Sequence, residues 1–406
     1  MFNGLAKYSL FSGMLAFAGL PIYLHAPKYF VDTYDISLTA IGFTLLGLRL
    51  LDFIQDPIIG WWLDNMKTGH ELFAAVMGVM MSGSMFALFA VPAMGSPLIW
   101  FITFMIVLFS SFSILSILFY SQGIEKAKSL GGQGHVRLAI WREAGGLVGV
   151  CFAALIPTIF AILGVINPMA GFAISFVLIA LISTYFMARE WKTVSLPKSN
   201  LRLILIDPTL RYLLFIALLN AAPLAITTTL FLFYVEACLG SQTATGPLLL
   251  IFFLCAALST PIWGKLVTLY STRKTLLFAM VLSIISFSFV FSLGAGDIFL
   301  FAIVCAVSGF TLGADMTLLP AAFARRIDQM GISGGQAFGA WSFCAKFTLA
   351  LAAAFVLPLL DWVEFSTSEP NTDAAIWALT LLYAGLPCIL KLGAMLVLSS
   401  SHLREI

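Results

Sequence analysis

Charged side chains are scarce in this 406-residue chain, at 10% of all residues against roughly 25% in a typical soluble protein. Hydrophobic residues account for 61% of the chain. So few charges cannot cover a water-facing surface, which excludes an ordinary soluble globular protein. The net charge of +2 is carried by basic residues spread over many loops, so we expect no nucleic-acid partner.

Catalytic and metal-binding motifs are also missing. The four histidines are scattered without metal-ligand spacing, and the six cysteines form no CxxC pair, so the cysteines are interpreted as small buried hydrophobes. The glycine-rich stretch 131–135 lacks the Lys-Ser/Thr ending of a phosphate-binding loop. We therefore expect neither an enzyme nor a cofactor. Transport, if the protein performs it, needs an ion gradient or the gradient of the solute itself.

Long apolar runs dominate instead. Most are 20–27 residues long, enough for a helix to cross ~30 Å of hydrocarbon, and they lack the alternation of barrel strands. The sequence predicts an all-α integral membrane protein in contact with the bilayer. The twelve expected transmembrane helices lie near 8–30, 38–63, 72–92, 97–121, 137–163, 166–187, 210–235, 245–269, 275–293, 297–324, 334–359 and 374–399.

The longest polar stretch between these spans falls at the middle of the chain. It predicts two six-helix halves, 1–188 and 210–406, joined by a linker over 189–209. A short internal repeat supports the division, because Pro57-Ile-Ile-Gly60 recurs as Pro261-Ile-Trp-Gly264 at the matching point of the second half. Duplicated six-helix halves are the architecture of the major facilitator fold.

Lysine and arginine gather in alternate loops. One set of loops holds residues such as Lys126, Arg202 and Arg273, whereas the opposite set holds Lys28 and is otherwise acidic. Because basic residues favour the inner side of a membrane, both termini are expected in the cytoplasm, in a bacterial-type inner membrane.

Two acids stand inside the expected span 38–63. Asp52 lies about 14 residues, or roughly 20 Å, into it, and Asp56 follows one turn later on the same face with Gln55. Two carboxylates in a low dielectric repel unless one holds a proton or a cation lies between them. The pattern indicates binding of Na⁺ or H⁺. The alternative is a self-satisfied ion pair between Arg49 and Asp52.

Four further ionisable residues fall in or beside expected spans. Lys346 is roughly 18 Å into span 334–359, either as a switchable charge partner or in a static ion pair. Arg142 and Asp315 are candidates for a gate, a substrate contact or a structural ion pair. His25 could titrate near neutral pH, although an interfacial role is the alternative.

Several of these segments resemble one known family. The stretch from Arg49 to Gly60 is similar to the helix 2 signature of the glycoside–pentoside–hexuronide:cation symporters, the melibiose-permease group of the major facilitator superfamily. The stretch Gly335 to Lys346 resembles their helix 11 pattern. Further similarities are Tyr120-Ser121, Trp141-Arg-Glu-Ala144, Gly313-Ala-Asp315 and Leu319-Pro320.

This resemblance implies a monomeric cation symporter for a sugar or glycoside, working by alternating access. It implies a cation site formed by Asp52, Gln55 and Asp56 with a helix 4 hydroxyl, which aligns with Ser113. Lys346 would communicate between cation and solute sites. Tyr120 and Trp341 join Arg142, Asp315 and His25 as substrate or gate candidates.

One departure affects the expected solute. The acids that hold the sugar in the melibiose transporters fall at Ala16 and Ser116 in this chain. An amphipathic lipid such as a lysophospholipid is therefore an alternative solute. A membrane receptor or assembly factor that transports nothing is the alternative from another functional class.

Overall fold

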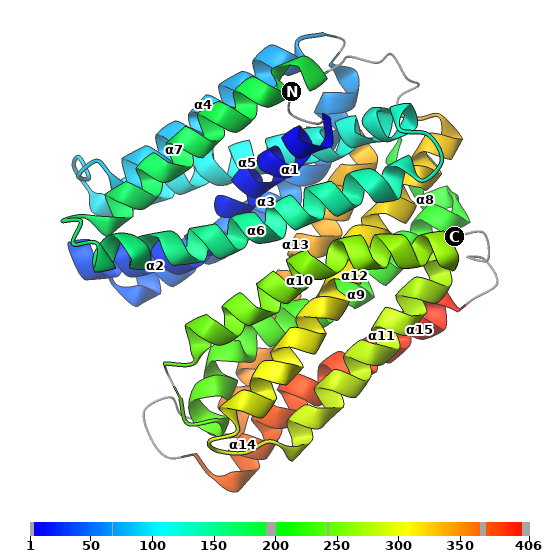
Figure 1. The fold of residues 1–406 in the computed structure, drawn as a ribbon. Coiled ribbons are helices and arrows are strands. Elements are labelled where there is room, and N and C mark those ends of the chain that lie inside the picture. The colour runs from blue at the N-terminus through cyan, green and yellow to red at the C-terminus, as the bar shows by residue number, and fades with distance from the viewer. Residues whose placement is uncertain (1–3, 67, 192–199, 242, 366–370, 400–406) are drawn as a thin grey trace. The chain divides into compact units, whose positions relative to one another are not determined.

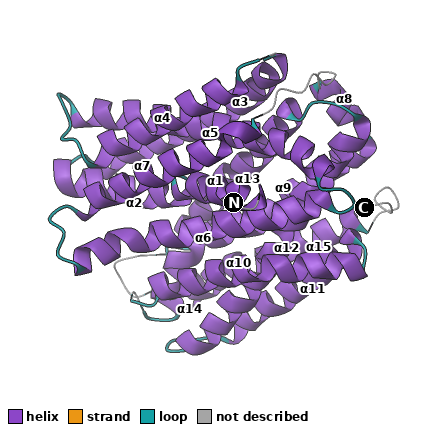
Figure 2. Ribbon diagram, turned by 45° about the horizontal axis from the view of Figure 1, so that its top comes forward, coloured by secondary structure: helices purple, strands orange, loops and turns teal. Residues whose placement is uncertain are grey.

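The computed structural model describes the chain except residues 1–3, 67, 192–199, 242, 366–370 and 400–406. Every regular element among the described residues is a helix (Figure 2), which confirms the predicted all-α class. Ten helical segments in this part of the chain are long and apolar enough to cross a membrane. A multi-pass membrane protein is therefore the correct class.

The described residues form two compact units. The first comprises residues 1–203 and 327–343, and the second comprises residues 204–326 and 344–406. Helices α12 (Ile298–Met330) and α13 (Gly335–Trp362) each pass from one unit to the other. The predicted contiguous halves with a linker over 189–209 remain a prediction, and residues 192–199 of that linker lie outside the described residues.

The first unit is built from the N-terminal helices. They are α1 (Gly4–Phe17), α2 (Leu20–Tyr34), α3 (Leu38–Asn65), α4 (His70–Phe89), α5 (Pro97–Ser129), α6 (Gly134–Ile162), α7 (Pro168–Met187) and η1 (Ala188–Glu190), followed by α8 (Leu201–Ile206) at the boundary. Helices α4 and α7 lie side by side (Figure 1), and α1 packs along α6. Glycines bring the last two backbones together, because a Cβ on Gly145 would collide with the carbonyl oxygen of Ser9.

The first two expected spans differ in continuity. The sequence predicts one helix over residues 8–30, but these residues are divided between α1 and α2, with the break at Ala18 and Gly19. Pro21 stands in the first turn of α2, where a residue without an amide hydrogen begins a helix readily and continues one poorly. By contrast, α3 is a single helix of 28 residues, about 42 Å long.

The second unit has an aromatic pair in its apolar core. Tyr234 and Tyr383 stack there with ring centroids 4.4 Å apart, and each belongs to a short π-helical segment. The elements, besides the parts of α12 and α13 that lie in this unit, are α9 (Pro208–Phe233), η2 (Tyr234–Cys238), α10 (Thr245–Leu269), α11 (Thr272–Ser288), η3 (Phe289–Ser292), α14 (Asp373–Thr380), η4 (Leu381–Gly385) and α15 (Leu386–Leu398).

Candidate functional site

Two of the three acids of α3 are removed from water. Asp52 is 3% exposed and Asp56 is 0% exposed, although both stand in a mainly apolar helix. Burying a carboxylate is costly unless a proton, a cation or hydrogen-bond donors compensate its charge. The partners of these two side chains therefore define what the site can bind.

Gln55 connects the acid pair to α5. Its Nε2 donates to Oδ1 of Asp52 at 2.7 Å, and its Oε1 accepts from the hydroxyl of Ser110 at 3.0 Å. The family resemblance points to Ser113 as the α5 hydroxyl. Ser113 is buried one turn further along, but the hydrogen bond to Gln55 comes from Ser110.

The first residues of α13 hold two acids of α3. The Ser342 hydroxyl donates to Oδ2 of Asp56 at 2.5 Å. The two carboxylate oxygens of Asp64 accept from the backbone amides of Gly335 at 2.8 Å and Gln336 at 2.9 Å. A carboxylate is favoured there because the first amides of a helix lack internal partners and carry partial positive charge.

Glycines allow this close contact between α3 and α13. A Cβ on Gly60 would lie 2.5 Å from the Gly335 carbonyl oxygen, and one on Gly339 would lie 2.8 Å from the Asp56 carbonyl oxygen. The two backbones therefore touch beside the acid pair. Any displacement of the start of α13 must change the surroundings of Asp56.

Arg142 and Tyr120 meet at a third residue. Arg142 Nε donates to Oε1 of Glu143 at 2.7 Å, and the Tyr120 hydroxyl donates to the same oxygen at 3.0 Å. The guanidinium carbon of Arg142 also lies 3.8 Å from the centre of the Tyr120 ring. Arg142 and Glu143 are both buried, and the three side chains provide hydrogen-bond partners for one another. The sequence identifies Arg142 and Tyr120 as site candidates but not the glutamate that joins them.

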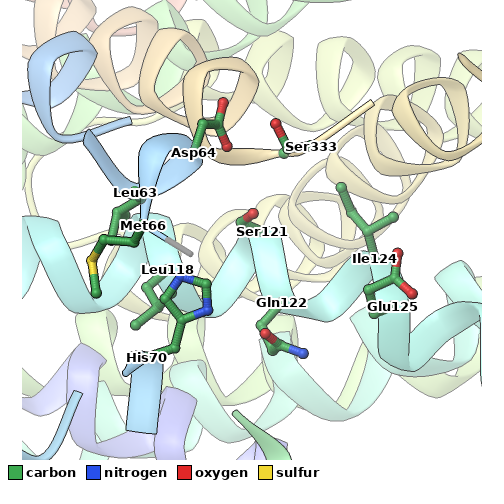
Figure 3. A pocket seen from close by; sticks show the side chains of 11 residues that line it. Leu63, Asp64, Met66, His70, Leu118, Ser121, Gln122, Ile124, Glu125 and Ser333 are labelled. Carbon is green, nitrogen blue, oxygen red and sulfur yellow. The ribbon is translucent and has the colours of Figure 1, made fainter. Parts of the chain in front are cut away.

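A small pocket adjoins the contact between α3 and α13. Figure 3 shows Asp64, His70, Gln122, Glu125 and Ser333 among the side chains that line it. Its lining mixes polar and apolar side chains from α3, α4, α5 and the connection before α13. Asp64, which caps α13, therefore also lines this pocket.

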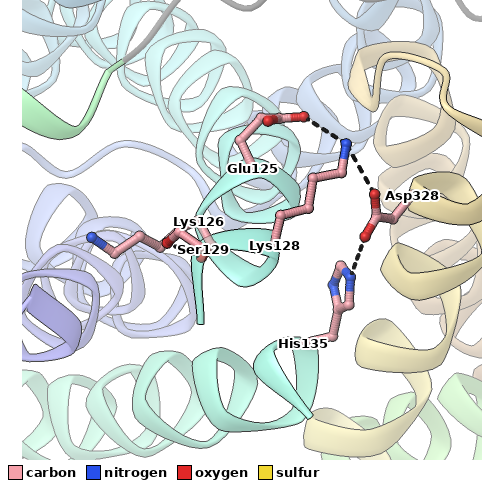
Figure 4. A network of polar contacts seen from close by, with 6 residues as sticks. All are labelled: Glu125, Lys126, Lys128, Ser129, His135 and Asp328. Carbon is pink, nitrogen blue, oxygen red and sulfur yellow. Dashed lines mark hydrogen bonds and ion pairs between the residues drawn. The ribbon is translucent and has the colours of Figure 1, made fainter. Parts of the chain in front are cut away.

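A polar network lies near the far ends of α5 and α12. Asp328 accepts from Lys128 at 2.9 Å through Oδ1, and its Oδ2 lies 3.0 Å from Nε2 of His135. Lys128 also pairs with Glu125 at 3.0 Å, as Figure 4 shows. The network ties the last turn of α12 to the end of α5 and the first turn of α6.

The remaining candidates from the sequence are placed as follows. Lys346 lies on α13 one turn after Ser342, and belongs to the second unit. Arg49 is half-buried on α3, Trp341 is half-buried on α13, and the His25 ring lies 5.6 Å from the Phe172 ring. Their functional roles remain predictions.

The second unit holds a polar cluster of its own. Lys391 on α15 pairs with Oδ2 of Asp315 on α12 and donates to Oδ1 of Asn220 on α9 at 2.6 Å. Sequence reasoning names Asp315 and misses Lys391, although an ionisable residue inside the last apolar run is a sufficient signal. It also misses Ser342, which stands one turn before Lys346.

Comparison with known families decides the class of the protein. The family model described as MFS/sugar transport protein matches residues 9–404. The chain belongs to this family. It is therefore a membrane transporter of the major facilitator superfamily rather than an enzyme. The finer assignment to the melibiose-permease group is not part of this result.

Solved structures share the transporter's fold. A bacterial homologue of the iron transporter ferroportin, in an outward-facing state, matches with a TM-score of 0.68 and 14% identity, covering 98% of each chain. The same homologue with soaked iron matches with a TM-score of 0.67 and 15% identity, covering 97% of this chain and 98% of that one. Among curated proteins none matches this transporter. At such low identity the similarity establishes the fold alone.

Proposed function

We propose that this transporter moves a small organic solute, such as a sugar or glycoside, together with Na⁺ or H⁺ bound at Asp52 and Asp56. The observation that carries the proposal is the burial of both carboxylates one turn apart on α3. Two carboxylates that are buried from water one helical turn apart favour either a shared proton or a bound cation.

The groups around the pair suit both ions. Gln55 contacts Asp52 through its Nε2, and the neutral oxygens of its own amide and of the Ser110 hydroxyl lie next to that contact; hard oxygen ligands are what Na⁺ prefers. For H⁺, a buried carboxylate with a hydroxyl partner can hold the proton without further ligands. Ser113 and Arg49 remain proposed members of the cation site.

Coupling would act through α13. Ser342 contacts Asp56, and Lys346 follows it by one turn of the same helix. A cation on Asp56 competes for the oxygen that Ser342 now occupies, so its binding alters how the start of α13 is held. A shift of α13 in an alternating-access cycle would link the cation site to the solute.

Thermal unfolding of the detergent-purified chain tests the cation site without a known solute. A ligand that binds only the folded state raises the unfolding temperature as its concentration increases. The wild type should be stabilised by Na⁺ at neutral pH, or by acidification when Na⁺ is absent. Asp56→Asn should abolish that response.

A matched control separates the site from general charge effects. Asp32 is an exposed acid on α2, so Asp32→Asn should respond to Na⁺ and to pH as the wild type does. An unchanged response in both Asp52→Asn and Asp56→Asn would refute the cation site. A lysophospholipid that stabilises the chain when neutral sugars do not would favour the lipid alternative.

A further inference from the structure

The cluster of Asp315, Lys391 and Asn220 leaves one buried carboxylate oxygen without a donor among the described residues. Lys391 binds Oδ2 of Asp315 and Oδ1 of Asn220, whereas Oδ1 of Asp315 is buried with no hydrogen-bond partner among the described residues. The three side chains are only 6–8% exposed. A buried acceptor without a donor is rare in folded proteins and calls for an explanation.

The cluster lies at mid-helix depth in the second unit. Asp315 stands 17 residues after Ile298 and 15 before Met330 in α12, which is about 26 Å and 22 Å from the two helix ends. Solute sites of secondary transporters lie near the bilayer midplane, beside helices with interrupted hydrogen bonding. The depth of Asp315 fits such a site.

The helices that carry Asn220 and Lys391 each continue into a π-helical segment, which begins 14 residues after Asn220, about 21 Å along the helix, and ends six residues before Lys391, about 9 Å. The helix that carries Asn220, α9, ends in the π-helical segment η2, and the helix that carries Lys391, α15, begins after the π-helical segment η4. Such π segments occur frequently at functional sites.

The charges of the cluster select the ligand. Lys391 neutralises Asp315, and Asn220 is uncharged, so the three side chains sum to no net charge. A cationic ligand at Oδ1 would meet Lys391 nearby, and an anionic ligand would meet the carboxylate. An uncharged group with a hydrogen to donate satisfies Oδ1 without disturbing the balance.

Among the contacts described for this cluster, Asp315 and Lys391 are the charged side chains. The α9 side contributes the Asn220 amide, and the α15 side contributes the Lys391 ammonium. On the α10 side, α12 packs closely at Gly313, against the Ser259 hydroxyl. The ion pair therefore keeps its neutrality whichever neutral ligand enters.

We propose that Asp315 Oδ1, held in place by Lys391 and Asn220, accepts a hydrogen bond from a hydroxyl of an uncharged, polyhydroxylated solute. This inference rests on the proposed function, because it assigns part of the solute site of the same transporter. It places the recognition of a solute hydroxyl in the second unit. In the first half, Ala16 and Ser116 stand where the family resemblance leads us to expect the acids that hold the sugar.

Ligand-induced thermal stabilisation of the purified full-length chain tests this site. The probes are neutral mono- and disaccharides, a cationic amino sugar and an anionic uronic acid. At least one neutral sugar should stabilise the wild type, and the two charged sugars should bind more weakly than their neutral counterparts. Asp315→Asn should weaken binding of that neutral sugar by up to about 10-fold, because a neutral amide oxygen replaces a charged acceptor.

Two further variants keep the test decisive. Because Asp315→Asn leaves Lys391 buried without its counter-charge and could unfold, the double variant Asp315→Asn/Lys391→Met keeps the cluster neutral and should show the same loss of sugar affinity. Thr317 is the matched control, since its hydroxyl is also buried on α12 without a partner among the described residues. Thr317→Val should bind the sugar as the wild type does.

The outcomes separate this inference from the cation site. Wild-type sugar affinity in the double variant would show that Asp315 and Lys391 form a static ion pair, and would overturn the inference. Failure of every neutral sugar to stabilise the wild type would overturn it as well. The response to Na⁺ without sugar reports on Asp52 and Asp56 alone, so either proposal can fail while the other holds.

Discussion

Ser342 donates its hydroxyl hydrogen to the fully buried carboxylate of Asp56 at 2.5 Å, and so joins α13 to α3. A hydrogen bond to a charged group contributes about 1.5–3 kcal/mol. Ser342→Ala should lower the stability of the cation-free protein by about this amount and enlarge the stabilisation that Na⁺ or a proton provides. Thermal unfolding with and without Na⁺ measures both quantities.

Ser110→Ala is the control for that experiment. Ser110 donates to the neutral Gln55 amide, so its removal should cost only about 0.5–1.5 kcal/mol and leave the Na⁺ response smaller than in Ser342→Ala. If Ser342→Ala and Ser110→Ala behave alike, the contact between Ser342 and Asp56 has no special link to the cation site.

The glycine contact between α3 and α13 should be sensitive to a single methyl group. In Gly339→Ala the new Cβ would lie 2.8 Å from the Asp56 carbonyl oxygen, which forces the helices apart at a cost of roughly 1–3 kcal/mol. A methyl group added to Gly42, on the same α3 helix, would meet no atom of the described residues within 4 Å. Gly42→Ala should therefore be neutral or slightly stabilising, and equal losses from the two substitutions would contradict the close contact.

The cap of α13 gives a separate prediction. Asp64→Ala removes the acceptor for the Gly335 and Gln336 amides, and should cost about 0.5–2 kcal/mol, as the loss of other helix caps does. Asp64→Asn keeps one acceptor oxygen and should lose less. Limited proteolysis of the connection 331–334 should accelerate more in the alanine variant, and an unchanged rate would argue against the cap.

Acid sensitivity is predicted at the start of α9. Burial alone would raise the pKa of Asp207, but hydrogen bonds from Arg326 and from the Leu210 and Thr209 amides, with the Arg326 charge, lower it below its usual value. Asp207 at a lowered pKa stabilises the folded state above pH ~4, and this contribution is lost as pH falls through the folded-state pKa.

The variant Asp207→Asn should therefore lose less stability than the wild type between pH ~6 and pH ~3. The substitution removes the charge that pairs with Arg326. It keeps the cap that binds the Leu210 amide, because asparagine also caps helices well. If the stability of the two proteins depends on pH in the same way, the ion pair between Asp207 and Arg326 is not the cause of the acid sensitivity.

The sequence was sufficient for the fold class and for the place of the acids on one helix. Apolar runs of membrane-spanning length determine the helices, and the spacing of Asp52 and Asp56 by four residues puts them on one face whatever surrounds them. The break in the first span depends on Ala18, Gly19 and Pro21 together. Hydropathy does not detect such a break, because all three residues are compatible with an apolar run.

Partners from distant helices could not be predicted in the same way. Ser110 and Ser113 lie on the same helix one turn apart, and Ser110 donates to Gln55. The pairing of Asp315 with Lys391 joins residues 76 positions apart. Neither relationship follows from local pattern, because each depends on how helices pack.

The most direct test of the central claim is gradient-driven uptake into proteoliposomes. The solute is the neutral sugar that stabilises the wild type most, and the driving force is an inward Na⁺ or H⁺ gradient. The account predicts that the wild type accumulates the sugar above its external concentration, whereas Asp52→Asn and Asp56→Asn insert normally and do not. Full accumulation by both variants would contradict cation coupling at Asp52 and Asp56.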